Sequence, residues 1–168
     1  VETINLLASN QQVGSSGADK ITLTAIVKDV NNNLVEGATV SFSSTSGSIE
    51  HDPKIKTGAD GKVTAILSTE AEPENRVIDI SATSDLIADS VSVQVVGTTV
   101  SFTGSSSLAI GDENNFIINV LDSDGDALAD EKVSLSLTNE STETPSGDVA
   151  ALSLPTEVTT DFTGQITV

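Results

Sequence analysis

The 168-residue sequence contains no cysteine, methionine, tryptophan or tyrosine, and only four phenylalanines. Without cysteine the chain can have neither a disulfide framework nor thiolate metal ligands. Without tryptophan or tyrosine it lacks the side chains that most often stack on sugars or anchor protein interfaces. Because methionine is also absent, we interpret the chain as a fragment from which a signal peptide or an anchor could have been removed.

Basic residues are scarce as well, because 7 Lys and Arg stand against 25 Asp and Glu, which gives a net charge of −18. Such an acidic protein repels nucleic acid and anionic membranes, so we expect no nucleic-acid partner. No apolar run approaches the roughly 20 residues that a membrane helix needs, so we expect no direct membrane insertion by this fragment. We interpret most of the acidic residues as an exposed, solvated surface.

The dominant pattern is an alternation of apolar and polar residues on either side of a polar turn at Asp29–Asn33. Alternation with a period of two predicts half-buried β-strands, because successive side chains leave opposite faces of a sheet. The positions expected to point inward in and around this stretch are Ile21, Leu23, Ala25, Val27, Val40, Phe42 and, further along, Leu67.

The same pattern returns in Phe116–Leu137, with Asp122–Asp126 as its turn. The apolar counterparts there are Phe116, Ile118, Val120, Val133 and Leu135. A unit that recurs at this spacing indicates tandem domains. We therefore predict an all-β chain of two immunoglobulin-like β-sandwiches, residues 1–97 and 98–168. The second is expected to be truncated at its C-terminal end, because the last two strands of the pattern have no counterpart.

About seven strands are expected in the first domain, as in an immunoglobulin-like sandwich. They are Thr3–Ser9, Lys20–Asp29, Ala38–Ser44, a short edge strand at Lys54–Thr57, Lys62–Thr69, Arg76–Thr83 and Asp89–Val96. Asn10–Asp19 and Thr45–Pro53 are expected to be loops. Three phenylalanines are expected in strand cores, at positions 42, 102 and 116, whereas Phe162 lies in a turn.

Three stretches carry a resemblance to a known family: Ile21–Asp29, Val35–Ser43 and Thr57–Thr69. Their pattern, ITLTAxVxD, VxGATVSFS and TxADGKVTAxLST with Gly61 in the last, resembles the bacterial immunoglobulin-like domains of the intimin/invasin adhesins. The second domain departs from it, since Asp130-Glu131 replaces Gly37-Ala38 and Thr163-Gly164 replaces Asp60-Gly61. The resemblance implies a tandem array in a virulence-related adhesin that is anchored in the outer membrane and exposed at the bacterial cell surface.

In such proteins these domains are mainly spacers, so the resemblance implies cell adhesion through a distal binding domain, with neighbouring domains of the same chain as partners. An alternative is direct binding of a host or bacterial surface protein through a sheet edge or the long loop Asn139–Pro155. A third is a carbohydrate-binding accessory module, which the shortage of aromatics disfavours. We expect no enzyme, because the single histidine, His51, has no convergent partners and no Gly-x-Ser-x-Gly motif occurs.

One constellation could bind a metal. Asp122, Asp124 and Asp126 alternate around Gly125, and calcium prefers several oxygen ligands. The alternative is an ordinary polar hairpin turn, because Asp29–Asn33 occupies the same place in the first domain without the extra charge. No other cofactor and no catalytic residue is expected.

Overall fold

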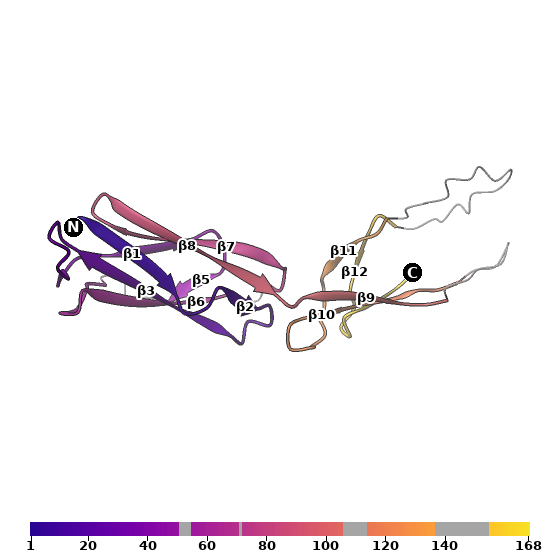
Figure 1. Ribbon diagram of the computed structural model, residues 1–168. Helices are drawn as coiled ribbons and strands as arrows, with labels where there is room; N and C mark the ends of the chain where they lie inside the picture. Colours follow the sequence, from indigo (N-terminus) through magenta and orange to yellow (C-terminus); the bar gives the residue numbers. More distant parts are fainter. Residues whose placement is uncertain (51–54, 71, 106–113, 137–154) are drawn as a thin grey trace. The chain divides into compact units, whose positions relative to one another are not determined.

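The computed structural model describes residues 1–50, 55–70, 72–105, 114–136 and 155–168, coloured along the chain in Figure 1. These residues form strands, turns and irregular segments, so the all-β prediction is confirmed. Within them no helix is long and apolar enough to cross a membrane. Contacts group the chain into two compact units, described separately below. Unit 1 is Val1–Thr98 with Asp122–Asp124, and unit 2 is Thr99–Leu121 with Gly125–Val168.

Unit 1 is a sandwich of two four-stranded sheets, as predicted for an immunoglobulin-like domain (Figure 1). The first sheet contains, in spatial order, β1 (Thr3–Ala8), β3 (Lys20–Lys28), β6 (Lys62–Ser68) and β5 (Ser48–Glu50). The second contains β2 (Gln12–Gly14), β8 (Ile87–Val96), β7 (Arg76–Ser84) and β4 (Ser41–Ser44). Neighbouring strands are antiparallel except β2 and β8, which are parallel.

The core of unit 1 lies where the sequence pattern predicts it. Leu23, Ala25 and Val27 of β3 are completely buried, and Leu67 of β6 is buried with them. Phe42 of β4 closes the core from the other sheet and is 8% exposed. The opposing sheet contributes buried residues from β7 and β8, namely Ile78, Ile80, Ala82, Val93 and Val95. Burial of these aliphatic side chains is the main source of stability for a domain of this size.

Two short strands were not predicted. β2 lies inside the expected loop Asn10–Asp19, and β5 lies inside the expected loop Thr45–Pro53. The edge strand of the first sheet is therefore Ser48–Glu50, whereas Lys56 forms only an isolated bridge with Thr39. Three residues are too few for a period-two pattern to stand out, and pairing with β8 and β6 makes these segments extended.

Unit 2 contains a three-stranded sheet of β9 (Thr99–Thr103), β10 (Ile117–Leu121) and β13 (Gln165–Thr167), with β10 in the centre. β11 (Lys132–Ser134) and β12 (Glu157–Thr159) form a separate antiparallel pair. The predicted inward positions Ile118 and Val120 are buried, together with Ile166 of β13. Phe116, Val133 and Leu135 are only half-buried.

Two of the three predicted core phenylalanines are not buried in a strand, because Phe116 is half-buried just before β10 and Phe102 is exposed. Phe102 of β9 is 64% exposed, whereas Phe42 is buried as predicted and Phe162 is 90% exposed in its turn. Phe116 packs closely over Gly104, because a Cβ added at Gly104 would collide with the Phe116 ring. In unit 1 the equivalent cross-strand pair is Ala8 and Leu23. Unit 2 therefore has a larger side chain on one strand, Phe116 in place of leucine, and a smaller residue opposite it, Gly104 in place of alanine.

Candidate functional site

The described residues contain no group of three or more His, Asp or Glu side chains that could hold a metal ion. What the two units share is a set of backbone hydrogen bonds where β3 meets the segment before β6. In unit 1 the Val27 N–H donates to the Gly61 carbonyl at 2.9 Å, and the Val35 N–H donates to the Val27 carbonyl at 3.0 Å. These bonds fix both the turn Asp29–Asn33 and the turn that precedes β6 to the C-terminal end of β3.

Unit 2 repeats this arrangement bond for bond. The Val120 N–H donates to the Gly164 carbonyl at 2.9 Å, and the Leu128 N–H donates to the Val120 carbonyl at 3.0 Å. Gly61 and Gly164 have φ angles of +63° and +69°, a left-handed conformation that glycine adopts without steric cost. The repeat seen in the sequence is therefore a repeat of backbone geometry and of bonding partners.

A buried threonine joins the segment before β6 to the segment between β3 and β4 in unit 1. Thr57 is 3% exposed, and its hydroxyl accepts the Ala38 N–H at 3.0 Å while donating to the Val35 carbonyl at 2.6 Å. The Thr57 backbone completes the junction, since its N–H donates to the Ala38 carbonyl at 2.9 Å and its carbonyl accepts the Gly37 N–H at 2.8 Å. One side chain thus satisfies a donor and an acceptor that would otherwise lose their partners on folding.

Thr160 does the same in unit 2. It is 2% exposed, accepts the Glu131 N–H at 2.9 Å and donates to the Leu128 carbonyl at 2.7 Å. We refer to Thr57 and Thr160 as the threonine pins. Sequence reasoning did not single them out, although both open the matching stretches TGADGKVTA and TDFTGQITV.

The departure from the family pattern at Asp130 has a local structural explanation. Gly37 has a φ angle of +77°, and Asp130, which occupies its place in unit 2, has a φ angle of +60°. Aspartate enters the left-handed region more readily than most side chains. The Asp130 N–H donates to the Thr160 carbonyl at 3.1 Å, so the bond that Gly37 makes in unit 1 is retained.

Aspartates organise a turn in each unit. The Asp29 carboxylate accepts the N–H groups of Asn31 at 2.9 Å and Asn33 at 2.8 Å. These bonds, with those from Asn33 the largest contribution, lower the pKa of Asp29 below its ordinary value. Asp161 in unit 2 accepts bonds from Thr163 and Gln165, which likewise lower its pKa.

Among the calcium candidates, the Asp122 carboxylate accepts the Asp124 N–H at 2.9 Å. Asp29 makes the matching bond to Asn31 in unit 1, so the same turn geometry occurs there without a cluster of charge. Asp122 and Asp124 are grouped with unit 1, and Asp126 with unit 2. This bond supports the turn alternative, and calcium binding at these three aspartates stays a prediction.

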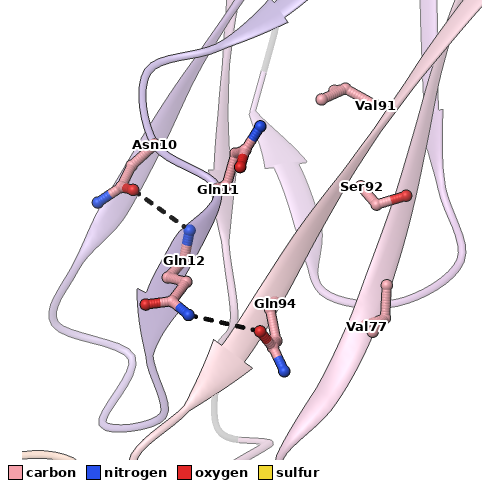
Figure 2. Close-up of a pocket in the computed structure, with 7 residues that line it drawn as sticks. All are labelled: Asn10, Gln11, Gln12, Val77, Val91, Ser92 and Gln94. Carbon is pink, nitrogen blue, oxygen red and sulfur yellow. Dashed lines mark hydrogen bonds between the residues drawn. The ribbon is translucent and has the colours of Figure 1, made fainter.

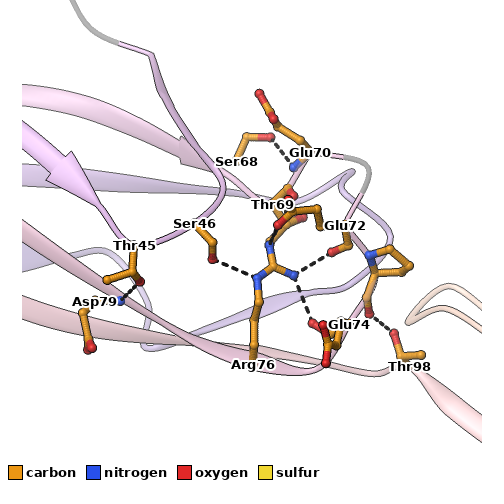
Figure 3. A network of polar contacts seen from close by, with 11 residues as sticks. Thr45, Ser46, Ser68, Thr69, Glu70, Glu72, Glu74, Arg76, Asp79 and Thr98 are labelled. Carbon is orange, nitrogen blue, oxygen red and sulfur yellow. Dashed lines mark hydrogen bonds and ion pairs between the residues drawn. The ribbon is translucent and has the colours of Figure 1, made fainter. Parts of the chain in front are cut away.

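Glu72 and Glu74, in the loop before β7, are held by Arg76, whose side chain is only 16% exposed. Figure 3 shows its guanidinium directed into the loop, where it pairs with the Glu72 carboxylate at 2.9 Å and donates to the Glu74 carbonyl at 3.0 Å. Its Nε donates to the Ser46 hydroxyl at 2.9 Å. A planar guanidinium suits this task because its five donors point in fixed directions.

The same loop holds Thr98, the last residue of the continuous stretch Val1–Thr98 of unit 1. The Asn75 side chain donates to the Thr98 carbonyl at 2.8 Å and accepts the Thr98 N–H at 3.0 Å. The Thr98 hydroxyl donates to the Pro73 carbonyl. Arg76 therefore orders a loop that in turn fixes the backbone where the chain leaves the unit.

A shallow hollow lies on unit 1 beside β2, β7 and β8, and Figure 2 shows the residues around it. They are Asn10, Gln11, Gln12, Val77, Val91, Ser92 and Gln94. The Gln12 side chain donates to the Gln94 side chain at 3.4 Å. This lining offers amides, a hydroxyl and two valines but no charged group, so it provides neither a general acid and base pair nor a metal site. His51 and all of Asn139–Pro155 except Pro155 lie outside the described residues.

The fold of unit 1 is an immunoglobulin-like β-sandwich, and comparison with known families identifies the family to which the chain belongs. The family model described as bacterial Ig-like domain (group 1) matches residues 3–96, more than half of the chain. The chain belongs to this family. A search of curated proteins found no match.

Similar solved structures are domains of bacterial adhesins. The structure of the Yersinia pseudotuberculosis adhesin InvE matches with a TM-score of 0.59 at 20% identity, over 98% of this chain and 49% of that one. Invasin, described as a bacterial integrin-binding protein, matches with a TM-score of 0.53 at 19% identity, over 78% and 28%. The D00–D0 domain of intimin matches with a TM-score of 0.50 at 22% identity, over 56% and 48%. This chain spans half or less of the length of these structures, and at these identities the likeness is one of fold.

Proposed function

We propose that this chain is a spacer segment of a bacterial cell-surface adhesin. Its immunoglobulin-like units hold a distal binding domain away from an outer-membrane anchor, and they catalyse no reaction. The observation that carries the proposal is the duplicated hydrogen-bond frame of Val27 and Gly61 in unit 1 and of Val120 and Gly164 in unit 2. A module that is copied bond for bond, turn positions included, is suited to extension by repetition.

Three further observations support a mechanical role. The chain belongs to a family of bacterial Ig-like domains, and its fold is similar to that of the adhesin InvE. Thr98 is held by Asn75, and Arg76 holds Glu74 of the same loop, which suits a segment that must transmit force along the chain. The net charge of −18 keeps long acidic arrays soluble and mutually repelling.

The alternative is that the chain itself binds a host or bacterial surface protein. Binding of coated beads separates the spacer hypothesis from the direct-binding hypothesis. Beads are coated with the 168-residue fragment, and their saturable binding to host cells and matrix proteins is measured. The spacer reading predicts no more binding than beads coated with an unrelated immunoglobulin-like pair of similar charge. Saturable binding that is lost on deletion of residues 139–154 would overturn it in favour of direct recognition through that segment.

A further inference from the structure

One side of β8 in the second sheet of unit 1 is only partly paired. On one side β8 pairs with β7 continuously from Ile87 to Val95. On the other side β2 pairs only with Gln94–Val96. Among the described residues, no strand lies beside the preceding stretch, Ala88–Ser92, on that side. We refer to Ala88–Ser92 as the free edge.

Three residues of the free edge direct their backbone groups outward. The Gln94 N–H donates to the Gln11 carbonyl at 2.8 Å, so Gln94 faces away from β7. Because alternate residues of a strand turn their N–H and carbonyl groups to the same side, Ala88, Ser90 and Ser92 face the same way. All three are exposed, and no described residue bonds to these backbone groups. Each therefore offers a donor and an acceptor to an added strand.

The free edge also lacks the features that usually block strand addition. It contains no proline and no lysine, and its register with β7 is uninterrupted. Its one charged residue, Asp89, is half-buried, and its carboxylate accepts the Leu6 N–H at 2.8 Å. The hollow in Figure 2 is lined by Gln11 and by Val91 and Ser92, so the surface beside the edge is open where β2 begins.

The side chains along the free edge favour a second copy of this chain over a peptide of particular sequence. Peptides that add to a sheet edge are selected by pockets for alternate side chains. The exposed side chains here, those of Ala88, Ser90 and Ser92, are too small to form such pockets. Small, uncharged side chains instead let two identical edges approach closely. The net charge of −18 repels copies of the chain, but physiological salt screens this repulsion beyond about 8 Å.

We propose that the free edge of β8 pairs antiparallel with the free edge of a second copy, with Ser90 opposite Ser90 of that copy. In this register Ala88 lies opposite Ser92, so every free backbone group gains a partner. Asp89 lies opposite Val91 and not opposite another carboxylate. The contact is shorter than interfaces that bury about 1,200 Å² or more, so the association is weak and suits copies at high local concentration. This inference does not depend on the spacer role.

The first test uses the cysteine-free background of the chain. Ser90→Cys places two thiols opposite each other, on Cα atoms about 5.5 Å apart, which suits a disulfide. Ser92→Cys is the matched control, because its two thiols lie roughly 14 Å apart along the paired strands. Leu86→Cys, at a position that is 98% exposed, reports chance collisions. Under mild oxidation, Ser90→Cys should form a cross-linked dimer about tenfold or more faster than either control.

Sedimentation velocity tests the pairing without a covalent bond. The average mass of the parent 168-residue chain should rise with protein concentration. Ser90→Asp sets two like charges opposite each other and should raise the dissociation constant of the dimer by about tenfold or more. Ser43→Asp adds the same charge at an exposed position of β4, on the opposite edge of the same sheet, and should leave the dissociation constant unchanged. Circular dichroism checks that both variants are folded.

Three results would overturn the proposal. Cross-linking of Ser90→Cys that is no faster than that of Leu86→Cys shows that the free edges do not meet. A Ser90→Asp variant that associates as strongly as the parent assigns self-association to another surface. A parent chain that stays monomeric up to its solubility limit leaves the free edge to a different partner.

Discussion

Removal of the hydroxyl of the threonine pin in unit 1 should destabilise that unit while leaving its shape intact. Thr57→Val replaces the hydroxyl with a methyl group of the same size. The Ala38 N–H and the Val35 carbonyl then lose bonds of 3.0 Å and 2.6 Å. An unsatisfied buried group costs roughly 1–3 kcal/mol, and because both groups here are only partly buried we expect the lower half of that range for each, about 2–4 kcal/mol in all.

The assay is urea unfolding followed by circular dichroism, with hydrogen exchange of the β6 peptide assigning the affected transition to unit 1. Thr57→Ser retains both hydrogen bonds and loses one methyl group, so it should cost about 0.8 kcal/mol. Thr64→Val on the exposed face of β6 is the matched control, expected within about 0.5 kcal/mol of the parent chain. A Thr57→Val variant as stable as the parent, or a Thr57→Ser variant as unstable as Thr57→Val, would refute the reasoning.

Three further outcomes are expected. Phe42→Ala should cost about 3–5 kcal/mol in urea unfolding because the ring is buried. Phe162→Ala is the control, since Phe162 lies in an exposed turn, and it should change stability by less than about 0.5 kcal/mol. Equal effects of the two substitutions would contradict the assignment of the core. The pKa values of Asp29 and Asp161 are lowered in the folded state, so these carboxylates stabilise the fold above their ordinary pKa of 3.8, and this contribution is lost as the pH falls through and below that value. Replacing both residues by Asn should therefore narrow the difference in the free energy of unfolding between neutral and acid pH. An unchanged difference would argue against the hydrogen bonds that these two carboxylates accept. The turn interpretation of Asp122–Asp126 predicts the same thermal melting curve in excess calcium and in chelator. A melting temperature that is higher in calcium than in chelator, and that Asp124→Asn returns to the chelator value, would establish the metal site instead.

The strand pattern alone predicted the first sandwich closely. Apolar residues at every second position of β3 and β6, such as Leu23 and Leu67, give each strand a single inward face, and both proved buried. The short strands β2 and β5 were missed because their extended shape comes from pairing with β8 and β6 rather than from their own composition. Local pattern cannot identify a strand whose stability depends on its neighbours.

Phe102 shows a second limit of sequence reasoning. Its place in the alternation correctly assigns it to the inner face of β9, opposite Ile118. Whether an inner face is buried depends on the layer packed against it, which a single strand's pattern does not reveal. The threonine pins show the opposite case, a polar residue that is buried. Thr57 resembles an ordinary strand residue until its two hydrogen-bond partners, 19 and 22 residues away, are known.

The spacer role is tested most directly in the surface protein that carries this chain. The 168 residues are replaced by two unrelated immunoglobulin-like domains of similar length, and adhesion of the bacteria to host cells is measured beside a variant in which the segment is deleted. A spacer predicts that adhesion survives the replacement and weakens on deletion, because only reach is needed. Adhesion that is lost on replacement, with the protein still displayed at the surface, would contradict the account.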